Sequence, residues 1–281
     1  VNGHTIYTLS DGSSLTLLNF ESSSAEPEEE YNNNTAETED NGTRGSADTI
    51  EMGKAITGQI GSTSDLDFYT FTTTQASTLQ VIFDAPTSSS FNDYFSAAVL
   101  DANGNTLSSH QVGSDLTFSS ALSAAGTYYI QIADADFHND EQYSVTASLA
   151  NGTAGYETES NNSSGVADTL NSGSSMTGQV LSTSDTDYFG ITTDGAATVS
   201  INFDAPTNSA FNDYFKVALQ TATGTVLASQ DTGNDISFDA GVDAAGDYYI
   251  VIEDSDFHVT DEYTVSASIT AAAINNNTAA T

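Results

Sequence analysis

Hydrophobic and polar residues alternate with a period of two along much of this chain. The alternation is clear at residues 78–84, 128–133 and 143–149, and it is typical of β-strands with one buried face. Turn residues such as those at 101–105 separate these segments, and no window has the pattern of a capped amphipathic helix. The pattern predicts an all-β protein made of antiparallel β-sandwiches, with about seven or eight strands in each.

The chain also repeats itself with an offset of 120 residues. The sequence SDLD at residues 64–67 returns as SDTD at 184–187, and FNDYF at 91–95 returns unchanged at 211–215. The register does not slip within the repeat. We therefore predict two copies of one module, and we expect a site found in one copy to exist in the other.

The fold class that follows is two tandem antiparallel β-sandwich domains, jelly-roll-like, with an extra N-terminal hairpin segment. That segment has no second copy, and its Asp11-Gly12 pair is a hairpin turn signal between two short strands. The predicted parts are an N-terminal β segment and candidate donor strand at 1–20, an acidic linker at 21–36, sandwiches at 37–150 and 157–270, and a polar tail at 271–281.

Charge narrows the classes of partner. The chain has 39 Asp and Glu residues against 3 Lys and Arg residues, a formal net charge of −36. Nucleic acids and anionic lipids are bound mainly through Lys and Arg, so we expect no nucleic-acid partner. No run of apolar residues is long enough for a membrane helix, so we expect no membrane insertion. The first residue, Val1, fits a secreted protein whose leader was removed, and equally a trimmed chain.

Several motifs of the second copy form a recognisable set. They are ETESNN at residues 157–162, ADTL at 167–170, GQV at 178–180, SDTDYF at 184–189 and AGDYY at 245–249. Together they resemble the bacterial pre-peptidase C-terminal (PPC) domain, a family that includes collagen-binding modules of secreted collagenases and repeats of large calcium-dependent surface adhesins. The resemblance implies a jelly-roll sandwich of extracellular or cell-surface proteins, often with calcium bound before the first strand.

The residues themselves favour the same ion. Glu37, Glu39 and Asn41 alternate and so share one edge of an extended chain, while Asp65 and Asp67 precede a strand. If the two segments meet, their carboxylates repel one another strongly, and Ca²⁺ prefers such hard oxygen ligands. The alternative is that these acids are exposed linker charges. The predicted calcium ligands are Glu37, Glu39, Asn41, Asp65 and Asp67 in the first copy and Glu157, Glu159, Asn161, Asp185 and Asp187 in the second.

The first copy departs further from the family. Asp40 and Ser160 stand where the family often has Pro, and only the first copy has a glycine, Gly42, after the Asn. We therefore expect weaker calcium binding by the first copy.

A second set of acids recurs near strand ends, where binding residues tend to lie. These residues could hold an ion or a polar ligand, or they could cap turns beside aromatic residues that close the end of the sandwich. The set consists of Asp84, Asp93, Asp134, Asp136 and His138, with Asp204, Asp213, Asp254, Asp256 and His258 in the second copy.

Catalysis has little support in the sequence. Cysteine is absent, which excludes disulfides, thiol chemistry and Cys-based zinc sites. No G-x-S-x-G or H-E-x-x-H motif occurs, and the chain has no Trp and only one Arg. We therefore expect a protein without enzymatic activity.

Three functions remain open. The first is a calcium-binding structural or adhesive protein of the cell surface, which could self-assemble into a filament through its N-terminal strand. The second is an accessory module that binds polysaccharide or protein for a larger secreted enzyme or adhesin. The third is a halophilic acidic surface without specific metal sites.

Overall fold

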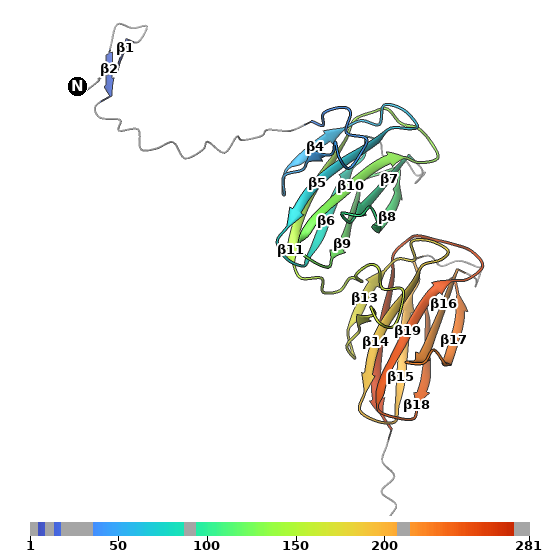
Figure 1. Ribbon diagram of the computed structural model, residues 1–281. Coiled ribbons are helices and arrows are strands. Elements are labelled where there is room, and N and C mark those ends of the chain that lie inside the picture. Colours follow the sequence, from blue (N-terminus) through green and yellow to red (C-terminus); the bar gives the residue numbers. More distant parts are fainter. Residues whose placement is uncertain (1–4, 9–13, 18–35, 87–93, 207–213, 273–281) are drawn as a thin grey trace, which may run out of the picture. The chain divides into compact units, whose positions relative to one another are not determined.

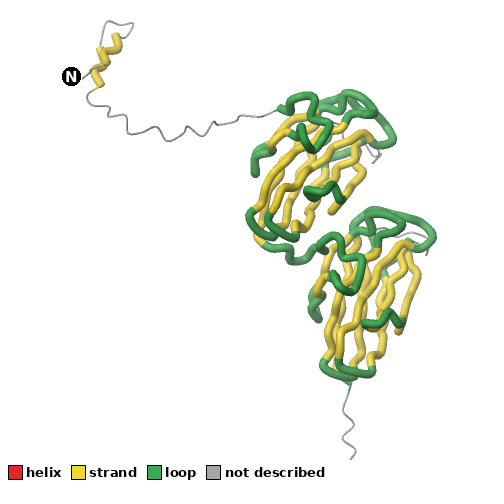
Figure 2. Tube along the Cα trace, viewed as in Figure 1, coloured by secondary structure: helices red, strands yellow, loops and turns green. Residues whose placement is uncertain are grey.

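The computed structural model describes residues 5–8, 14–17, 36–86, 94–206 and 214–272. The chain divides into two compact units, Val1–Asn34 and Thr35–Thr281. All regular structure in the described ranges is β-strand (Figure 2). They contain no helix of the length and apolarity needed to cross a membrane.

The N-terminal unit contains one antiparallel pair of strands. These are β1 (Thr5–Thr8) and β2 (Ser14–Leu17), with Thr5 opposite Leu17. The predicted Asp11-Gly12 turn lies outside the described residues.

The second unit contains two β-sandwiches, one for each copy of the repeat (Figure 1). In the first, a five-stranded sheet has the order β3-β5-β10-β7-β8 and faces a four-stranded sheet with the order β4-β11-β6-β9. The strands are β3 (Asp48–Thr49), β4 (Ala55–Gly58), β5 (Leu66–Thr73), β6 (Ser77–Asp84), β7 (Phe95–Leu100), β8 (Thr106–Val112), β9 (Leu116–Leu122), β10 (Gly126–Asp134) and β11 (Tyr143–Asn151).

The second sandwich repeats this topology strand for strand. Its sheets have the orders β12-β14-β19-β16-β17 and β13-β20-β15-β18. The strands are β12 (Asp168–Thr169), β13 (Ser175–Gly178), β14 (Thr186–Thr193), β15 (Ala197–Asp204), β16 (Phe215–Thr221), β17 (Val226–Thr232), β18 (Ile236–Val242), β19 (Gly246–Asp254) and β20 (Tyr263–Ala271).

The prediction of an all-β protein with two sandwiches is confirmed. The pairing differs from the predicted antiparallel pattern at two places in each module. Ala36 and Tyr156 form isolated parallel bridges with Thr57 and Thr177, and the short strands β3 and β12 run parallel to β5 and β14. These strands have two residues each, so no period can be read from their sequence.

The alternation along β6 shows how the sequence builds the core. Leu79, Val81 and Phe83 are completely buried, and the residues between them face outward. Each such side chain contributes roughly 1.5–3 kcal/mol to folding when fully buried. Phe83 and Phe95 pack against Tyr143 of β11, with ring centroids 5.4 and 5.9 Å from it. The Tyr143 ring thus belongs to the core, and its hydroxyl reaches the entrance of the sandwich.

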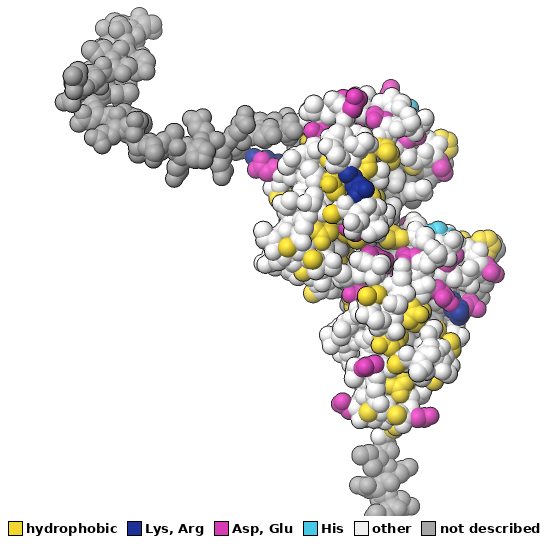
Figure 3. Space-filling view, viewed as in Figure 1, with side chains coloured by type: hydrophobic (Ala, Val, Ile, Leu, Met, Phe, Trp, Pro, Cys, Tyr) yellow, Lys and Arg dark blue, Asp and Glu magenta, His cyan; other side chains and the backbone are white. Residues whose placement is uncertain are grey.

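Acidic side chains are the main source of charge on the outer surface (Figure 3). Acidic side chains are spread over the visible face, with few basic ones among them (Figure 3). Two of the three basic residues are engaged by acids, since Lys54 lies 2.8 Å from Glu51 and Lys216 lies 2.5 Å from Glu253.

Candidate metal centre

Three carboxylates gather at the entrance of each sandwich. In the first they belong to Glu37, Glu39 and Asp67, and one oxygen from each lies within 4.8 Å of the others. Glu157, Glu159 and Asp187 form the same group in the second. Among the described residues, these are the two groups in which three or more acidic, histidine or cysteine side chains lie close enough together to hold a metal ion.

Main-chain hydrogen bonds bring the segments of this cluster together. Ala36 forms a parallel bridge with Thr57 of β4, and the Glu37 amide donates a hydrogen bond to the Thr57 carbonyl. On the other side, the Phe68 amide of β5 donates to the Asn41 carbonyl. The alternating Glu-x-Glu-x-Asn segment therefore lies between the two sheets, and Asp67 projects from β5 beside it.

A buried amide completes the cluster. Asn41 and Asn161 are both fully buried, and each donates from Nδ2 to the first glutamate of its cluster over 3.2 Å. Their Oδ1 atoms are buried and have no hydrogen-bond partner, and the same holds for Oδ1 of Asp67 and of Asp187. Because an unpaired buried oxygen costs roughly 1–3 kcal/mol, these atoms fit a bound cation.

One further acid in each module, which was not among the predicted ligands, contacts the cluster. Asp48 accepts hydrogen bonds from the Thr38 amide at 2.7 Å and from Asn41 Nδ2 at 3.2 Å. Asp168 makes the same contacts with Thr158 and Asn161 in the second module. Each acid holds the Asn amide by its nitrogen and leaves the oxygen available. The ADTL motif that contains Asp168 was the signal that could have revealed them.

A tyrosine hydroxyl supports the buried aspartate in each module. Tyr143 and Tyr263 donate to Oδ2 of Asp67 and of Asp187, both over 2.5 Å. In the first module a second hydroxyl, from Tyr69, donates to Glu37 Oε2 at 2.7 Å. Phe189 occupies the corresponding position of the second module, so Glu157 lacks this donor.

One predicted ligand in each module, Asp65 or Asp185, accepts hydrogen bonds from main-chain amides. Asp65 Oδ2 accepts the Gly61 amide at 2.7 Å, and Asp185 Oδ2 accepts the Leu181 amide at the same distance. Their Oδ1 atoms accept the amides of the residues that follow them. They therefore close the turns before β5 and β14, and neither belongs to a three-carboxylate group.

Burial and mutual repulsion disfavour the ionised forms. Burial, together with the Glu37 and Asp65 charges, raises the pKa of Asp67 to about 8 against the opposing hydrogen bond from Tyr143. Burial together with Asp185 raises the pKa of Glu159 to about 8. The pKa of Glu157 is raised well above its usual range by burial and then by the Asp187 charge. A cation among these groups would favour their charged forms.

The two clusters differ in exposure. Glu37 is partly exposed and Glu39 is exposed, whereas Glu157 is buried and Glu159 is half-buried. The difference arises because Glu157 also borders a small pocket lined by Ser108, Ser119 and Ala121 of the first sandwich.

Those members of the second predicted set that the structure describes do not form a comparable cluster. His138 Nδ1 lies 2.8 Å from Asp134 Oδ1, and His258 lies 3.2 Å from Asp254. Asp84 and Asp204 are exposed at strand ends, Asp136 and Asp256 are exposed in loops, and Asp93 and Asp213 lie outside the described residues. Beside these loops Phe137 packs on Tyr94 and Phe257 on Tyr214, with centroid separations of 5.9 and 5.8 Å.

Fold and site define a tandem β-sandwich protein with one carboxylate and amide cluster at the entrance of each module. No family model and no curated protein sequence matches the chain.

Solved structures do match it. The pre-peptidase C-terminal domain of a Bacillus anthracis collagenase is 17% identical, covers 36% of this chain and 93% of its own, and has a TM-score of 0.30. The tandem CBM51 modules of a Streptococcus pneumoniae family 98 glycoside hydrolase are 10% identical over 79% of this chain and 85% of theirs, with a TM-score of 0.28. The tandem CBM22 modules of Paenibacillus barcinonensis Xyn10C are 11% identical over 72% and 82%, with a TM-score of 0.24.

The predicted likeness to PPC domains is thus found among solved structures. This likeness concerns the fold, and the function proposed below rests on the chain's own residues.

Proposed function

We propose that this chain is a non-catalytic, calcium-binding structural protein of the cell exterior, with one Ca²⁺ site in each sandwich. The observation that carries the proposal is the pair of buried oxygens without partners, Asn41 Oδ1 and Asp67 Oδ1, beside three converging carboxylates. The second module repeats this arrangement with Asn161 and Asp187.

The donor set suits Ca²⁺ better than other divalent ions. It consists of carboxylate and amide oxygens, which calcium accepts in flexible numbers, whereas zinc prefers nitrogen or sulfur ligands and magnesium prefers strict octahedral geometry. In the first module the ligands would be Glu39, Asn41 and Asp67, and Glu37, the third carboxylate of the group, accepts a hydrogen bond from the Asn41 amide nitrogen. Asp48 would act as a positioning residue, because it contacts the Asn41 nitrogen.

Isothermal titration of the full chain with CaCl₂ at moderate salt tests the sites. We expect two sites with dissociation constants at or below about 1 mM, the range of extracellular calcium modules. Asp67→Asn should remove one site and Asp187→Asn the other. Asp194→Asn, which removes an exposed carboxylate of the second module, is the matched control and should retain both. The absence of saturable heat would overturn the proposal and favour the halophilic alternative.

Self-association would give such a protein its structural role. The N-terminal unit is separate from the sandwiches and has no second copy, which supports strand donation to a neighbouring molecule as the connecting mode. Removing residues 1–20 should abolish this mode and leave the folded second unit. Chains that still exchange strands after the deletion would contradict it.

A second function, binding of polysaccharide or protein as an accessory module, is favoured by the exposed aromatic residues at the sandwich ends. Phe137 is 54% exposed and Phe257 is 51% exposed, each beside a tyrosine. Glycan and peptide arrays should then give saturable binding that Tyr94→Ala weakens. Ile82→Ala, at an exposed apolar residue of β6, should leave that binding unchanged.

A further inference from the structure

The two sandwiches meet through the side chain of Gln179, which lies just after β13. Gln179 Nε2 donates to the Ser109 carbonyl at 3.0 Å, and the Ser109 amide donates to Gln179 Oε1 at 3.1 Å. The amide side chain thus bonds both main-chain groups of one residue of β8, which is an edge strand of the first sandwich. Gln179 also donates to the Thr260 carbonyl of its own module at 2.6 Å, and it is 97% buried.

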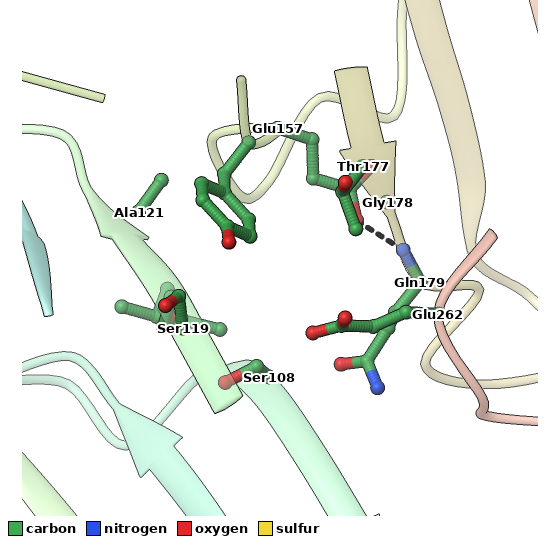
Figure 4. A pocket seen from close by; sticks show the side chains of 11 residues that line it. Ser108, Ser119, Ala121, Glu157, Thr177, Gly178, Gln179 and Glu262 are labelled. Carbon is green, nitrogen blue, oxygen red and sulfur yellow. Dashed lines mark hydrogen bonds between the residues drawn. The ribbon is translucent and has the colours of Figure 1, made fainter. Parts of the chain in front are cut away.

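Other side chains surround this contact. Ser108, Ser119 and Ala121 of the first module face Glu157, Gln179 and Glu262 of the second across a small pocket (Figure 4). His110 Nε2 lies 3.6 Å from Glu262 Oε1. The junction therefore has two complementary halves: the β8 edge of one module, and the face around Gln179 of the next.

Because the modules are copies, the chain carries each half a second time. The counterpart of Gln179 is Gln59, which makes the same bond within its module, to the Asp140 carbonyl, but is exposed. The counterpart of Ser109 is Ser229 on the edge strand β17. Ser109 lies opposite Ala98 and Ser229 lies opposite Ala218, so the two edges have the same register.

The outer β17 edge also exposes apolar side chains. Val226 is 49% exposed and Leu227 is 40% exposed, whereas Leu107, the counterpart of Leu227, is only partly exposed where it lines the junction pocket. An exposed sheet edge is a template for pairing with another chain, and exposed apolar side chains on it favour such a contact.

The ionisable pair of the junction, His110 and Glu262, has no equivalent at the outer halves, because both positions carry a different residue there. Gln230 stands at the position of His110, and Gln142 stands at the position of Glu262. Both are exposed. A histidine or glutamate retained on only one half would face an unmatched partner, whereas two amide side chains can bond each other.

We propose that a second copy of this chain docks at these outer halves, with the β17 edge of one molecule against the Gln59 face of the next. This proposal deepens the structural role proposed above, and the contact does not use residues 1–20. Because the two halves differ, the interface is heterologous and repeats from molecule to molecule, giving a ring if the rotation between molecules closes and an open filament if it does not.

Charge sets the conditions for this contact. Asp239, which replaces Ser119, would approach the cluster of Glu37 and Glu39 in the neighbouring molecule. Bound calcium and moderate salt reduce that repulsion. We therefore expect association in calcium and its loss in chelator.

Sedimentation velocity of the full chain in calcium tests the proposal over a range of concentrations. Gln59→Ala and Leu227→Asp should each weaken association about tenfold or more, equivalent to roughly 1.4 kcal/mol. The matched controls are Gln80→Ala and Ile82→Asp, which make the same changes at exposed positions of β6 and should associate like the unmodified chain.

A mixing experiment separates this geometry from a symmetric one. Each variant retains one intact half, so an equimolar mixture of Gln59→Ala and Leu227→Asp chains should form one-to-one dimers and no longer species. An unmodified chain that stays monomeric, or association that both variants leave unchanged, would overturn the proposal. If association instead requires residues 1–20 and neither substitution weakens it, the result supports strand donation and contradicts the docking contact.

Discussion

Chelation of calcium should destabilise both sandwiches, and the structure sets the size of the effect. In the calcium-free protein, the pKa of fully buried Asp67 is about 8, compared with roughly 3.9 in an unfolded chain. Between pH 4 and pH 7 the unfolded state loses a proton that the folded state keeps. At about 1.4 kcal/mol per pH unit, this costs the first module at most about 4 kcal/mol near pH 7.

The second module should respond in the same direction. The pKa of Glu159 is also about 8, but its side chain is half-exposed, so solvent screening reduces its own contribution. Burial raises the pKa of Asp187 and of Glu157 as well, and these two buried groups add to the destabilisation. We therefore expect the second module to lose at least as much stability as the first.

Differential scanning calorimetry of the full chain measures this loss. For domains of this size about 1 kcal/mol corresponds to roughly 3–5 °C in melting temperature, so EGTA should lower the melting temperature by up to about 12–20 °C. Glu159→Gln should reduce the calcium response of the second module more than that of the first, while Asp194→Asn should leave both responses unchanged.

The pH dependence gives an independent check of the sign. The pKa values of these acids are raised on folding, so their protonated forms favour the folded state. In EGTA the melting temperature should therefore rise as the pH falls from about 8 toward about 5, and calcium should remove most of that slope. Equal melting temperatures in EGTA and in calcium near pH 7 would refute the reasoning.

Two substitutions test other contacts. Gly178→Ala would bring a Cβ to 2.5 Å from the Tyr263 hydroxyl and 2.6 Å from Glu157 Oε2, so denaturant unfolding should show a loss of about 1–3 kcal/mol that Gly195→Ala, with open space around it, does not share. Burial lowers the pKa of His110 to about 4, which favours its neutral form in the fold. In calcium, which removes most of the slope due to the acids, acidification from about pH 7 to pH 5 should therefore lower the stability of the first module by up to about 2 kcal/mol. His110→Gln, which introduces the residue of the second copy, should flatten that slope. Because Glu262 is present in both proteins, an unchanged slope would show that another group titrates.

Much of the fold follows from the period-two pattern. The alternation at residues 78–84 matches β6. Successive side chains of a strand point to opposite faces of the sheet, so one is buried and the next is more exposed. The pattern could not predict β3, whose two residues owe their strand conformation to parallel pairing with β5.

The site was predictable only in part. The alternation of Glu37, Glu39 and Asn41 and the position of Asp67 led to the cluster, because repeated acids on one edge need a counter-charge. The hydrogen bonds by which Asp65 closes the turn before β5 could not be predicted, since a carboxylate that closes a turn looks like any other acid in the sequence. Asp48 and Gln179 act through contacts with distant segments, and no local pattern reveals such contacts.

The path of the chain through each sandwich has a mechanical consequence. The chain enters the first module at Ala36, beside Thr57 of β4, and Thr57 pairs with Ser144 of β11. It leaves at Asn151, seven residues further along β11 and about 23 Å away. Tension between these ends would first load the contacts that hold the entry segment to the sandwich, which include the hydrogen bonds from the Glu37 amide to the Thr57 carbonyl and from the Phe68 amide to the Asn41 carbonyl. The carboxylate cluster lies at the entry point, so bound calcium would set the force at which each module yields.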